Sequence, residues 1–236
     1  AGVLLVTFNV PVDVGSADYV QRAATVAIEN RYAVVIMMNT PGGLLDSMQA
    51  IVSSLGRVEA AGLRVVTFVP PNSMAASAGS YIALGSNAIY MGGGSFIGPS
   101  TPEVVGGTPE EQAHVQGAML AYIQALAGDH GFNATAAGNM VLYNLAYTTS
   151  DAAAVGLITG RQDTFDGVLS TEGLSGLPIV RYDEPVYDQF LSFLSDPLVD
   201  GLFILVGAVA LVLDIFHRTL FLSVVAVVMI ALGFLG

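Results

Sequence analysis

The pattern of hydrophobic and polar residues changes near residue 190. Before it, apolar and polar positions alternate periodically; beyond Pro197, polar residues nearly vanish. Two apolar stretches, 201–213 and 220–235, are separated by a short polar link, and with flanking residues each approaches the ~20 residues needed to cross a bilayer. The pattern predicts a globular domain over 1–190 and a membrane region over 191–236, with transmembrane helices at 198–216 and 219–236 forming a hairpin.

Within the first 190 residues, predicted strands alternate with predicted helices. Apolar, β-branched runs predict strands at 3–10, 33–38, 63–69 and 87–91. Helical periodicity predicts helices from Ser16 to about 30, at 44–55, from about Ala76, and at 109–127, 134–142 and 150–155, with Ser16 and Thr108 as N-caps. This alternation predicts an α/β domain with mostly parallel strands, whose carboxyl ends meet on one side.

Composition and charge narrow the setting. The chain is 53% hydrophobic and only 11% charged, with a mean hydropathy of +0.67, which is too apolar for an ordinary soluble domain. Its seven basic residues, all arginine, face nineteen acidic ones, a net charge of −12 that disfavours nucleic acid and anionic lipid headgroups. An acidic surface without lysine suits high salt. We therefore expect a salt-adapted host, and this hypothesis fails if the stability of the globular domain does not change as salt is raised to molar concentrations.

The predicted membrane region carries a weak topological signal. Arg218 is the basic residue in the link between the two apolar stretches, so the positive-inside rule places that link in the cytoplasm and the globular domain outside it. The chain starts without methionine and stops within apolar sequence, so we expect a fragment cut at both ends.

Candidate chemistry lies in two turns that follow consecutive predicted strands. The first is Asn39-Thr-Pro-Gly-Gly43, and the second, Met74-Ala-Ala-Ser-Ala-Gly79, contains Ser77. Alone, the first is typical of a plain turn, and Ser77 of a small residue in a packed helix. Together they place bare backbone N–H groups beside a serine at a helix start, which indicates acyl transfer, above all peptide hydrolysis.

These motifs resemble the membrane-bound NfeD proteins. The resemblance extends from Gly15-Ser-Ala-Asp-Tyr19 through both turns, Ile97-Gly98, Ala121-Tyr-Ile123 and Gly131-Phe-Asn-Ala-Thr135 to Ser195-Asp-Pro197. It implies a Clp-protease-like and crotonase-like fold of repeated β-β-α and βα units in a spiral, and a serine–lysine dyad acting on hydrophobic peptide segments. Ser77 falls on the family's nucleophile, and the amides of Gly42, Gly43 and Ala78 fall on its oxyanion hole.

The chain departs from this family at the catalytic base, because it contains no lysine. The family's lysine lies eight residues before a tyrosine, and counting back from Tyr122 puts His114 at that position. An imidazole, with an ordinary pKa of ~6.5, can accept a serine proton near neutral pH without the burial that a lysine needs. Glu110, one turn earlier, is the carboxylate nearest in sequence to orient the ring.

Three functions remain open. The first is a membrane-anchored serine endopeptidase that cleaves hydrophobic segments, with stomatin-like membrane proteins as substrates or partners. The second, suggested by the lost lysine, is an inactive scaffold for stomatin-like proteins. The third, an acyl-CoA enzyme, is weakened by the few basic residues available to bind the cofactor's phosphates. We expect contact with the lipid membrane, at least a homodimer, and neither cofactor nor metal.

Overall fold

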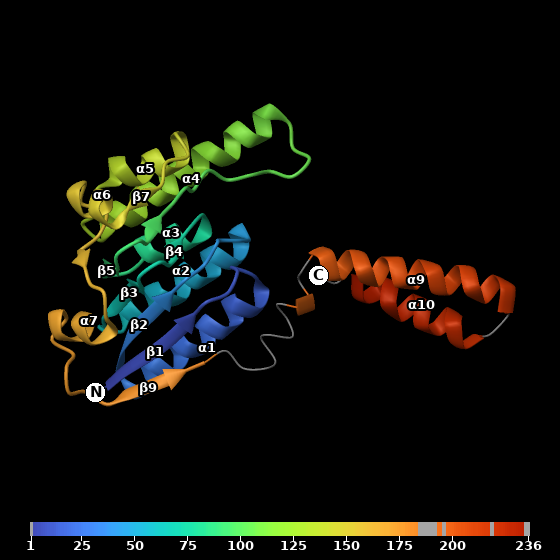
Figure 1. Ribbon diagram of the computed structural model, residues 1–236, viewed down its shortest axis with the longest axis horizontal. Coiled ribbons are helices and arrows are strands. Elements are labelled where there is room, and N and C mark those ends of the chain that lie inside the picture. The colour runs from blue at the N-terminus through green and yellow to red at the C-terminus, as the bar shows by residue number, and fades with distance from the viewer. Residues whose placement is uncertain (1, 184–192, 195–196, 218–219, 234–236) are drawn as a thin grey trace. The chain divides into compact units, whose positions relative to one another are not determined.

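The computed structural model describes residues 2–183, 193–194, 197–217 and 220–233. The chain divides into two compact units, one of residues 1–12 and 16–184 and the other of residues 13–15 and 185–236. Figure 1 shows strands and helices alternating in the first unit and two long helices in the second.

A six-stranded sheet with order β8–β5–β3–β2–β1–β9 forms the centre of the first unit, and every strand pair in it is parallel. Its strands are β1 (Gly2–Phe8), β2 (Tyr32–Met38), β3 (Val65–Val69), β5 (Ala88–Met91), β8 (Gly160–Arg161) and β9 (Ile179–Tyr182). The predicted α/β domain with parallel strands is therefore confirmed, while β8 and β9 were not predicted.

A second sheet has three strands of two residues each, in the order β4 (Met74–Ala75), β6 (Phe96–Ile97) and β7 (Tyr147–Thr148). β4 pairs with β6 in parallel, and β6 pairs with β7 in antiparallel. Strands this short carry no readable period in the sequence. β4 ends two residues before Ser77, so its pairing in this small sheet helps to position the serine.

The helices largely follow the predicted ones. They are α1 (Val14–Asn30), α2 (Leu45–Ala60), α3 (Ala78–Leu84), α4 (Pro109–Asp129), α5 (Ala134–Leu142), α6 (Thr149–Ala154) and α7 (Phe165–Thr171). Thr108 caps α4 as predicted, in a capping box with Glu111. Ser16 was wrongly predicted as a cap: α1 starts two residues earlier, after Asp13, which is also a favoured cap type, and Ser16 is buried inside the helix.

The central strands β1, β3 and β5 are buried on both faces, as parallel strands usually are, whereas the edge strand β9 is largely exposed. Leu4, Val6 and Phe8 of β1 belong to the larger core with α1, α2 and α3, whereas Val3 points to a smaller cluster with Val168 of α7. α4, α5 and α6 lie together at one end of this unit (Figure 1). The core accounts for the continuous apolar runs that predicted these strands.

The second unit contains α9 (Pro197–His217) and α10 (Leu220–Gly233). These helices approach closely: a Cβ added at Gly207 would lie 2.9 Å from the carbonyl oxygen of Ala226, and one at Gly233 would lie 2.8 Å from that of Asp200. Over the residues described, neither helix combines the length and the hydrophobicity that crossing a bilayer demands. Arg218 and residues 234–236, parts of the predicted link and second span, lie outside the described residues.

Candidate active site

The first unit contains a pocket of about 760 Å³, and Ser77 lies in its wall. Gly43 and Ala78, from the two turns, also line it. Much of the remaining wall is apolar, including Leu44, Leu45, Met48, Val104, Val115 and Met119. A pocket of this size and lining suits extended apolar side chains better than charged ones.

Backbone hydrogen bonds hold the two predicted turns together. The Thr40 N–H donates to the Met74 carbonyl at 2.9 Å, and the Ala76 N–H donates to the Thr40 carbonyl at 3.1 Å. A Cβ built on Gly42 would lie 2.4 Å from Ser77 Cβ and 3.0 Å from Ala78 N. Glycine is therefore required at position 42, both by this contact and by its φ of 101°.

Ser77 has a backbone conformation that residues with a side chain rarely adopt. Its φ is 48° and its ψ −121°, at the turn from β4 into α3, and the residue is only partly buried. Such strain costs of order 1–3 kcal/mol and clusters at functional sites. A serine on a sharp strand-to-helix turn is also the geometry that exposes the nucleophile in many hydrolases.

The predicted oxyanion amides differ in how they are used. Val12 pairs with the turn through the Gly42 carbonyl (2.8 Å) and the Leu44 N–H (2.7 Å), which leaves the Gly43 N–H outside this bridge. Ala78 is the first residue of α3, where an N–H has no partner within the helix. The Gly42 N–H instead donates to Thr40 Oγ1 at 3.2 Å, and Gly42 does not line the pocket.

His114, the predicted base, lies exposed on the first half of α4 and does not line the pocket. Its neighbour Val115 does, and so does Met119. Gln112 shares their side of the helix, and binds the preceding loop by accepting from the Val104 N–H at 2.9 Å and donating to the Pro102 carbonyl. His114 is two residues from Gln112 and therefore belongs to another face of the helix. Glu110 is exposed as well.

Two ionisable side chains do line the pocket, Glu103 and Tyr81. Glu103 is exposed, on the loop before α4. Burial raises the pKa of Tyr81 far above its usual value, so its hydroxyl stays protonated and donates to the Ser100 carbonyl at 3.2 Å. Its ring stacks on Tyr122 of α4 with centroids 6.0 Å apart, which fixes α4 beside α3.

The far end of α4 is held by a second histidine. His130 Nδ1 lies 2.9 Å from the Leu126 carbonyl, and Nε2 lies 3.0 Å from the carboxylate of Glu59 in α2. The hydrogen bond with Glu59 is the main cause that raises the pKa of His130 above its usual value. Protonation lets both ring nitrogens donate, so the charged imidazole fastens α4 to α2.

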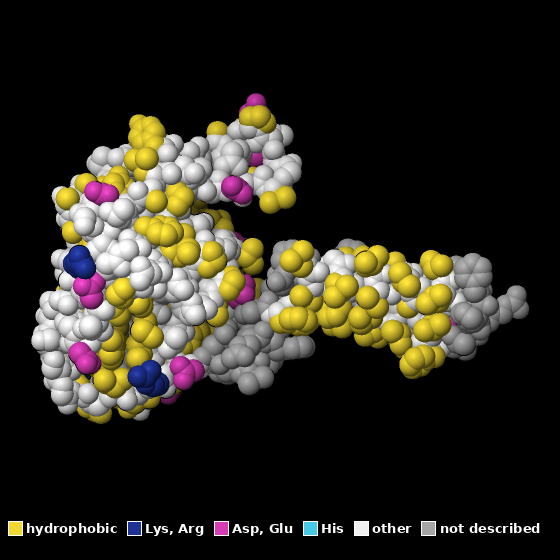
Figure 2. Space-filling model, in the orientation of Figure 1, with side chains coloured by type: hydrophobic (Ala, Val, Ile, Leu, Met, Phe, Trp, Pro, Cys, Tyr) yellow, Lys and Arg dark blue, Asp and Glu magenta, His cyan; other side chains and the backbone are white. Residues whose placement is uncertain are grey.

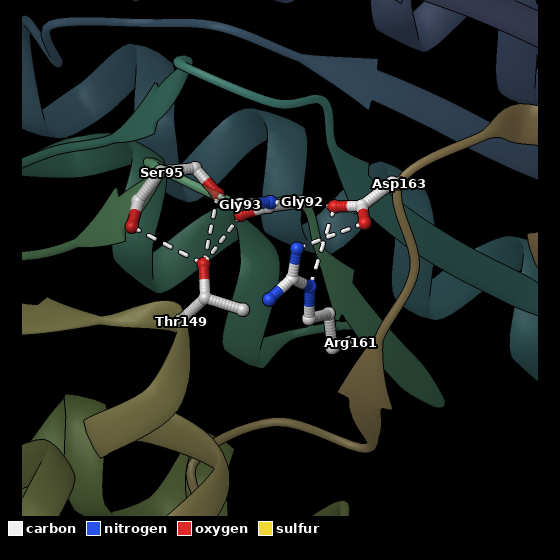
Figure 3. Close-up of polar contacts among 6 residues, drawn as sticks. All are labelled: Gly92, Gly93, Ser95, Thr149, Arg161 and Asp163. Atoms are coloured by element: carbon white, nitrogen blue, oxygen red, sulfur yellow. Dashed lines mark hydrogen bonds and ion pairs between the residues drawn. The ribbon is translucent and has the colours of Figure 1, made fainter.

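The glycine-rich segment before β6 is also anchored (Figure 3). The Gly92 carbonyl accepts from the hydroxyls of Ser95 and Thr149, and the Gly93 N–H donates to Asp163 at 2.7 Å. Arg161 pairs with Asp163 at 2.9 Å and is the main cause that lowers the pKa of this carboxyl. These contacts fix the start of β6, beyond which residues 98–100 approach Ser77.

Two hydroxyls near Ser77 escaped the sequence analysis. Ser80 and Ser100 are buried, and their Oγ atoms lie 2.6 Å apart. The spacing of Ser77 and Ser80 within a helix start could have predicted a hydroxyl bond to the Ser77 carbonyl. Nothing in the sequence places Ser100 there, because it comes from a loop that returns after β6.

Comparison with known proteins gives consistent relatives. Membrane-bound protease PH1510 of Pyrococcus horikoshii is 32% identical over an alignment of 218 residues. The match covers 83% of this chain and 49% of the relative, so the chain spans about half of that protein's length. The solved 1510-N membrane-bound stomatin-specific protease, a lysine-to-alanine mutant bound to a substrate peptide, matches with a TM-score of 0.69 and 27% identity, covering 81% of this chain and 96% of that one.

A further likeness concerns the fold alone. ClpP1 of Listeria monocytogenes matches with a TM-score of 0.56 and 15% identity, covering 70% of this chain and 94% of that one. The model of the NfeD1b N-terminal domain matches residues 2–178, three quarters of the sequence. With the parallel sheet, the paired turns and the protease relatives, this match shows that the chain belongs to the NfeD1b N-terminal domain family.

Proposed function

We propose that this chain is a membrane-associated serine endopeptidase with Ser77 as its nucleophile. The observation that carries the proposal is the Ser77 turn: a non-glycine residue with φ of 48° in the wall of a largely apolar pocket. The relatives described as proteases support it. Strain of this kind persists where the surrounding structure enforces it, as an active site does.

In the proposed mechanism, Ser77 Oγ attacks the scissile carbonyl and forms a bond to its carbon, while the serine proton passes to His114. The Gly43 and Ala78 N–H groups donate to the oxyanion. The C–N bond then breaks, the amine leaves with the proton from His114, and water hydrolyses the acyl-enzyme. Because Val115 rather than His114 lines the pocket, this base requires the first turns of α4 to move when a peptide binds.

The pocket lining supports hydrophobic peptide segments as substrates. Its apolar side chains can hold extended residues on either side of the scissile bond. One relative is described as stomatin-specific and is solved with a substrate peptide. We therefore propose stomatin-like membrane proteins as substrates or partners, and a homodimer or larger assembly as the acting form.

We further propose that α9 and α10 bring the enzyme to the membrane, with the peptidase domain on the extracytoplasmic side. Hydrophobic side chains cover much of the visible face of these helices (Figure 2). Several are more than half exposed, including Leu198, Leu205, Phe221, Val224 and Val227. Such an apolar surface favours lipid. Flotation with neutral vesicles tests this: the full chain should float, and a chain ending at residue 184 should not.

A second candidate function is a scaffold that binds stomatin-like segments without cleaving them. Two observations favour it: His114 lies exposed outside the pocket, and the chain has no lysine to replace it. In that case the pocket would retain the ancestral shape and bind peptides, while no base completes the site.

Mass spectrometry of apolar peptides incubated with the full chain separates the two functions. The endopeptidase produces two fragments at a defined bond, at a rate proportional to enzyme concentration. The scaffold binds the same peptides, as measured by fluorescence anisotropy, and returns them intact. If the peptides bind but no fragments appear at each pH tested between about 6 and 9, where an imidazole base is at least partly neutral, the endopeptidase is rejected.

A further inference from the structure

Two buried hydroxyls form a chain that ends on the backbone of Ser77. Ser80 Oγ lies 2.7 Å from the Ser77 carbonyl oxygen and 2.6 Å from Ser100 Oγ. Ser80 is fully buried and Ser100 is 2% exposed. Buried hydroxyls need hydrogen-bond partners, and here each hydroxyl finds its partner within the turn or in the loop packed against it.

The direction of the chain follows from counting hydrogens. A carbonyl only accepts, so the single hydrogen of the Ser80 hydroxyl points to the Ser77 oxygen. Ser100 must then donate its own hydrogen to Ser80 Oγ. The Ser77 carbonyl receives a second bond from the Ser80 N–H at 3.0 Å, so its orientation is fixed from two sides.

The other end of the Ser77 peptide is held by the same segment. The Ser77 N–H donates to the Pro99 carbonyl at 2.8 Å, directly before Ser100. Ser100 is itself fixed, because its N–H donates to the Met140 carbonyl at 2.9 Å and its carbonyl accepts from Tyr81. Pro99 therefore binds the Ser77 amide directly, and Ser100 acts on the Ser77 carbonyl through Ser80.

We propose that Ser80 and Ser100 are positioning residues, whose hydroxyl chain maintains the strained Ser77 backbone and thereby aims Ser77 Oγ and the Ala78 N–H at the pocket. The inference rests on the proposed role of Ser77 as nucleophile. Without the chain, the turn relaxes toward a negative φ, which rotates both the hydroxyl and the following amide away from a bound carbonyl.

The test uses two substitutions of nearly the same shape at Ser100, which lines the pocket. Ser100→Thr keeps the hydroxyl and Ser100→Val removes it. Modification of the full chain by a fluorophosphonate is followed over probe concentration. We expect Ser100→Val to lower the maximal rate about tenfold relative to Ser100→Thr, the value of one hydrogen bond, with little change in the half-saturating concentration.

Ser86→Ala is the matched control for general loss of a buried hydroxyl. Ser86 is fully buried just beyond the other end of α3, and its Oγ lies 2.8 Å from Thr67 Oγ1, away from the pocket lining. Ser86→Ala should lower thermal stability but leave the rate of modification unchanged. Ser80→Ala should slow modification as much as Ser80→Ala/Ser100→Val does. Without the Ser80 hydroxyl, the Ser100 hydroxyl has no hydrogen-bonded path to the Ser77 carbonyl.

Hydrogen exchange of the peptide covering 74–84 gives a readout that does not depend on activity. Exchange should be faster in Ser100→Val than in Ser100→Thr. Equal labelling and equal exchange in the two variants would overturn the inference. If the starting protein is not labelled at all, the proposed function fails; a difference in exchange would then support the backbone role of the hydroxyls and reject their catalytic consequence.

Discussion

The Ser77 turn and the first half of α4 carry the two halves of the proposed catalytic pair, and they are built differently. Backbone hydrogen bonds, two close glycine contacts and two buried hydroxyls determine the position of Ser77. His114 is exposed, and the side-chain hydrogen bonds between the start of α4 and the loop before it are made by Gln112, on another face of the helix. A nucleophile can therefore be held by hydrogen bonds and close packing within one turn, whereas a base on an exposed helix face must move to reach it.

The difference between the Ser77 turn and α4 follows from the residues that each region places at the pocket. At the turn, Gly42 and Gly79 let the backbone approach within contact distance of Ser77 Cβ and the Thr40 methyl group. A Cβ at either position would come within 2.5 Å of these atoms, so a larger residue at position 42 or 79 requires the turn to shift. On α4, the pocket-facing positions are Val115 and Met119, which supply apolar wall and no proton acceptor.

The largest expected effect is at the nucleophile. Ser77→Ala should lower peptide cleavage by about 10⁴-fold or more, since the remaining site can only bind and polarise the carbonyl. Cleavage of an apolar peptide is measured by mass spectrometry, with Ser73→Ala, a partly buried serine just before β4, as the matched control. Residual cleavage in Ser77→Ala close to that of the control would assign the activity to another residue.

The second prediction concerns the base, and its outcome decides whether α4 or the loop before it supplies the proton acceptor. If α4 moves in as proposed, His114→Ala should reduce the cleavage rate by about 10²–10⁴-fold, as loss of a general base does. Glu103→Gln removes the carboxylate that lines the pocket and should change the rate little. A large loss in Glu103→Gln with none in His114→Ala would move the base to the loop before α4.

The third prediction tests how rigid the turn is. Gly42→Ala places a Cβ against Ser77 and retains a φ that alanine disfavours, so we expect it to cost about 3 kcal/mol and lower Tm by roughly 10 °C. Gly62→Ala also has a positive φ but open space, and should lower Tm by only about 3 °C. Similar losses in the two variants would show that the close contact contributes little.

The smallest expected effect is a pH dependence at the far end of α4. The raised pKa of His130 means that folding favours its charged form, so the stabilisation is complete below the unfolded value of ~6.5 and disappears as pH rises through the higher folded value. His130→Gln should therefore cost roughly 1–2 kcal/mol in acid and less in alkali. Urea midpoints over a pH series measure this.

Glu59→Gln is the control for this contact. It should reproduce the pH dependence of His130→Gln, and combining the two substitutions should add little, because they remove the same ion pair. A difference between His130→Gln and the starting protein that stays constant with pH would contradict a charged histidine at this position.

The sequence predicted those features of the fold that depend on long periodic segments. Continuous apolar, β-branched runs predicted β1, β2, β3 and β5, and their βα order predicted that the Thr40–Gly43 and Ser77 turns would meet at one edge of the sheet. Thr108 was predicted as a cap because a favoured cap residue directly precedes Pro109 at the start of the helical pattern, and the structure adds a capping box with Glu111. Each of these signals is local in the chain.

The features that the sequence did not predict depend on contacts distant in the chain. Two-residue strands such as β4 and β6 exist only through their pairing. Ser100 approaches Ser80 because a loop returns after β6, which no spacing encodes. Counting back from Tyr122 placed His114 at the family's lysine position, but the helical phase set by Gln112 and Val115 turns another face to the pocket.

The central claim is that Ser77 is the reactive residue of this pocket. Peptide mapping after treatment of the full chain with a fluorophosphonate tests it most directly. We expect one phosphonylated residue, Ser77, and no adduct when the chain is unfolded by heat before the probe is added. An unmodified Ser77 in the folded chain, or an adduct on Ser80, Ser100 or another hydroxyl, would contradict it.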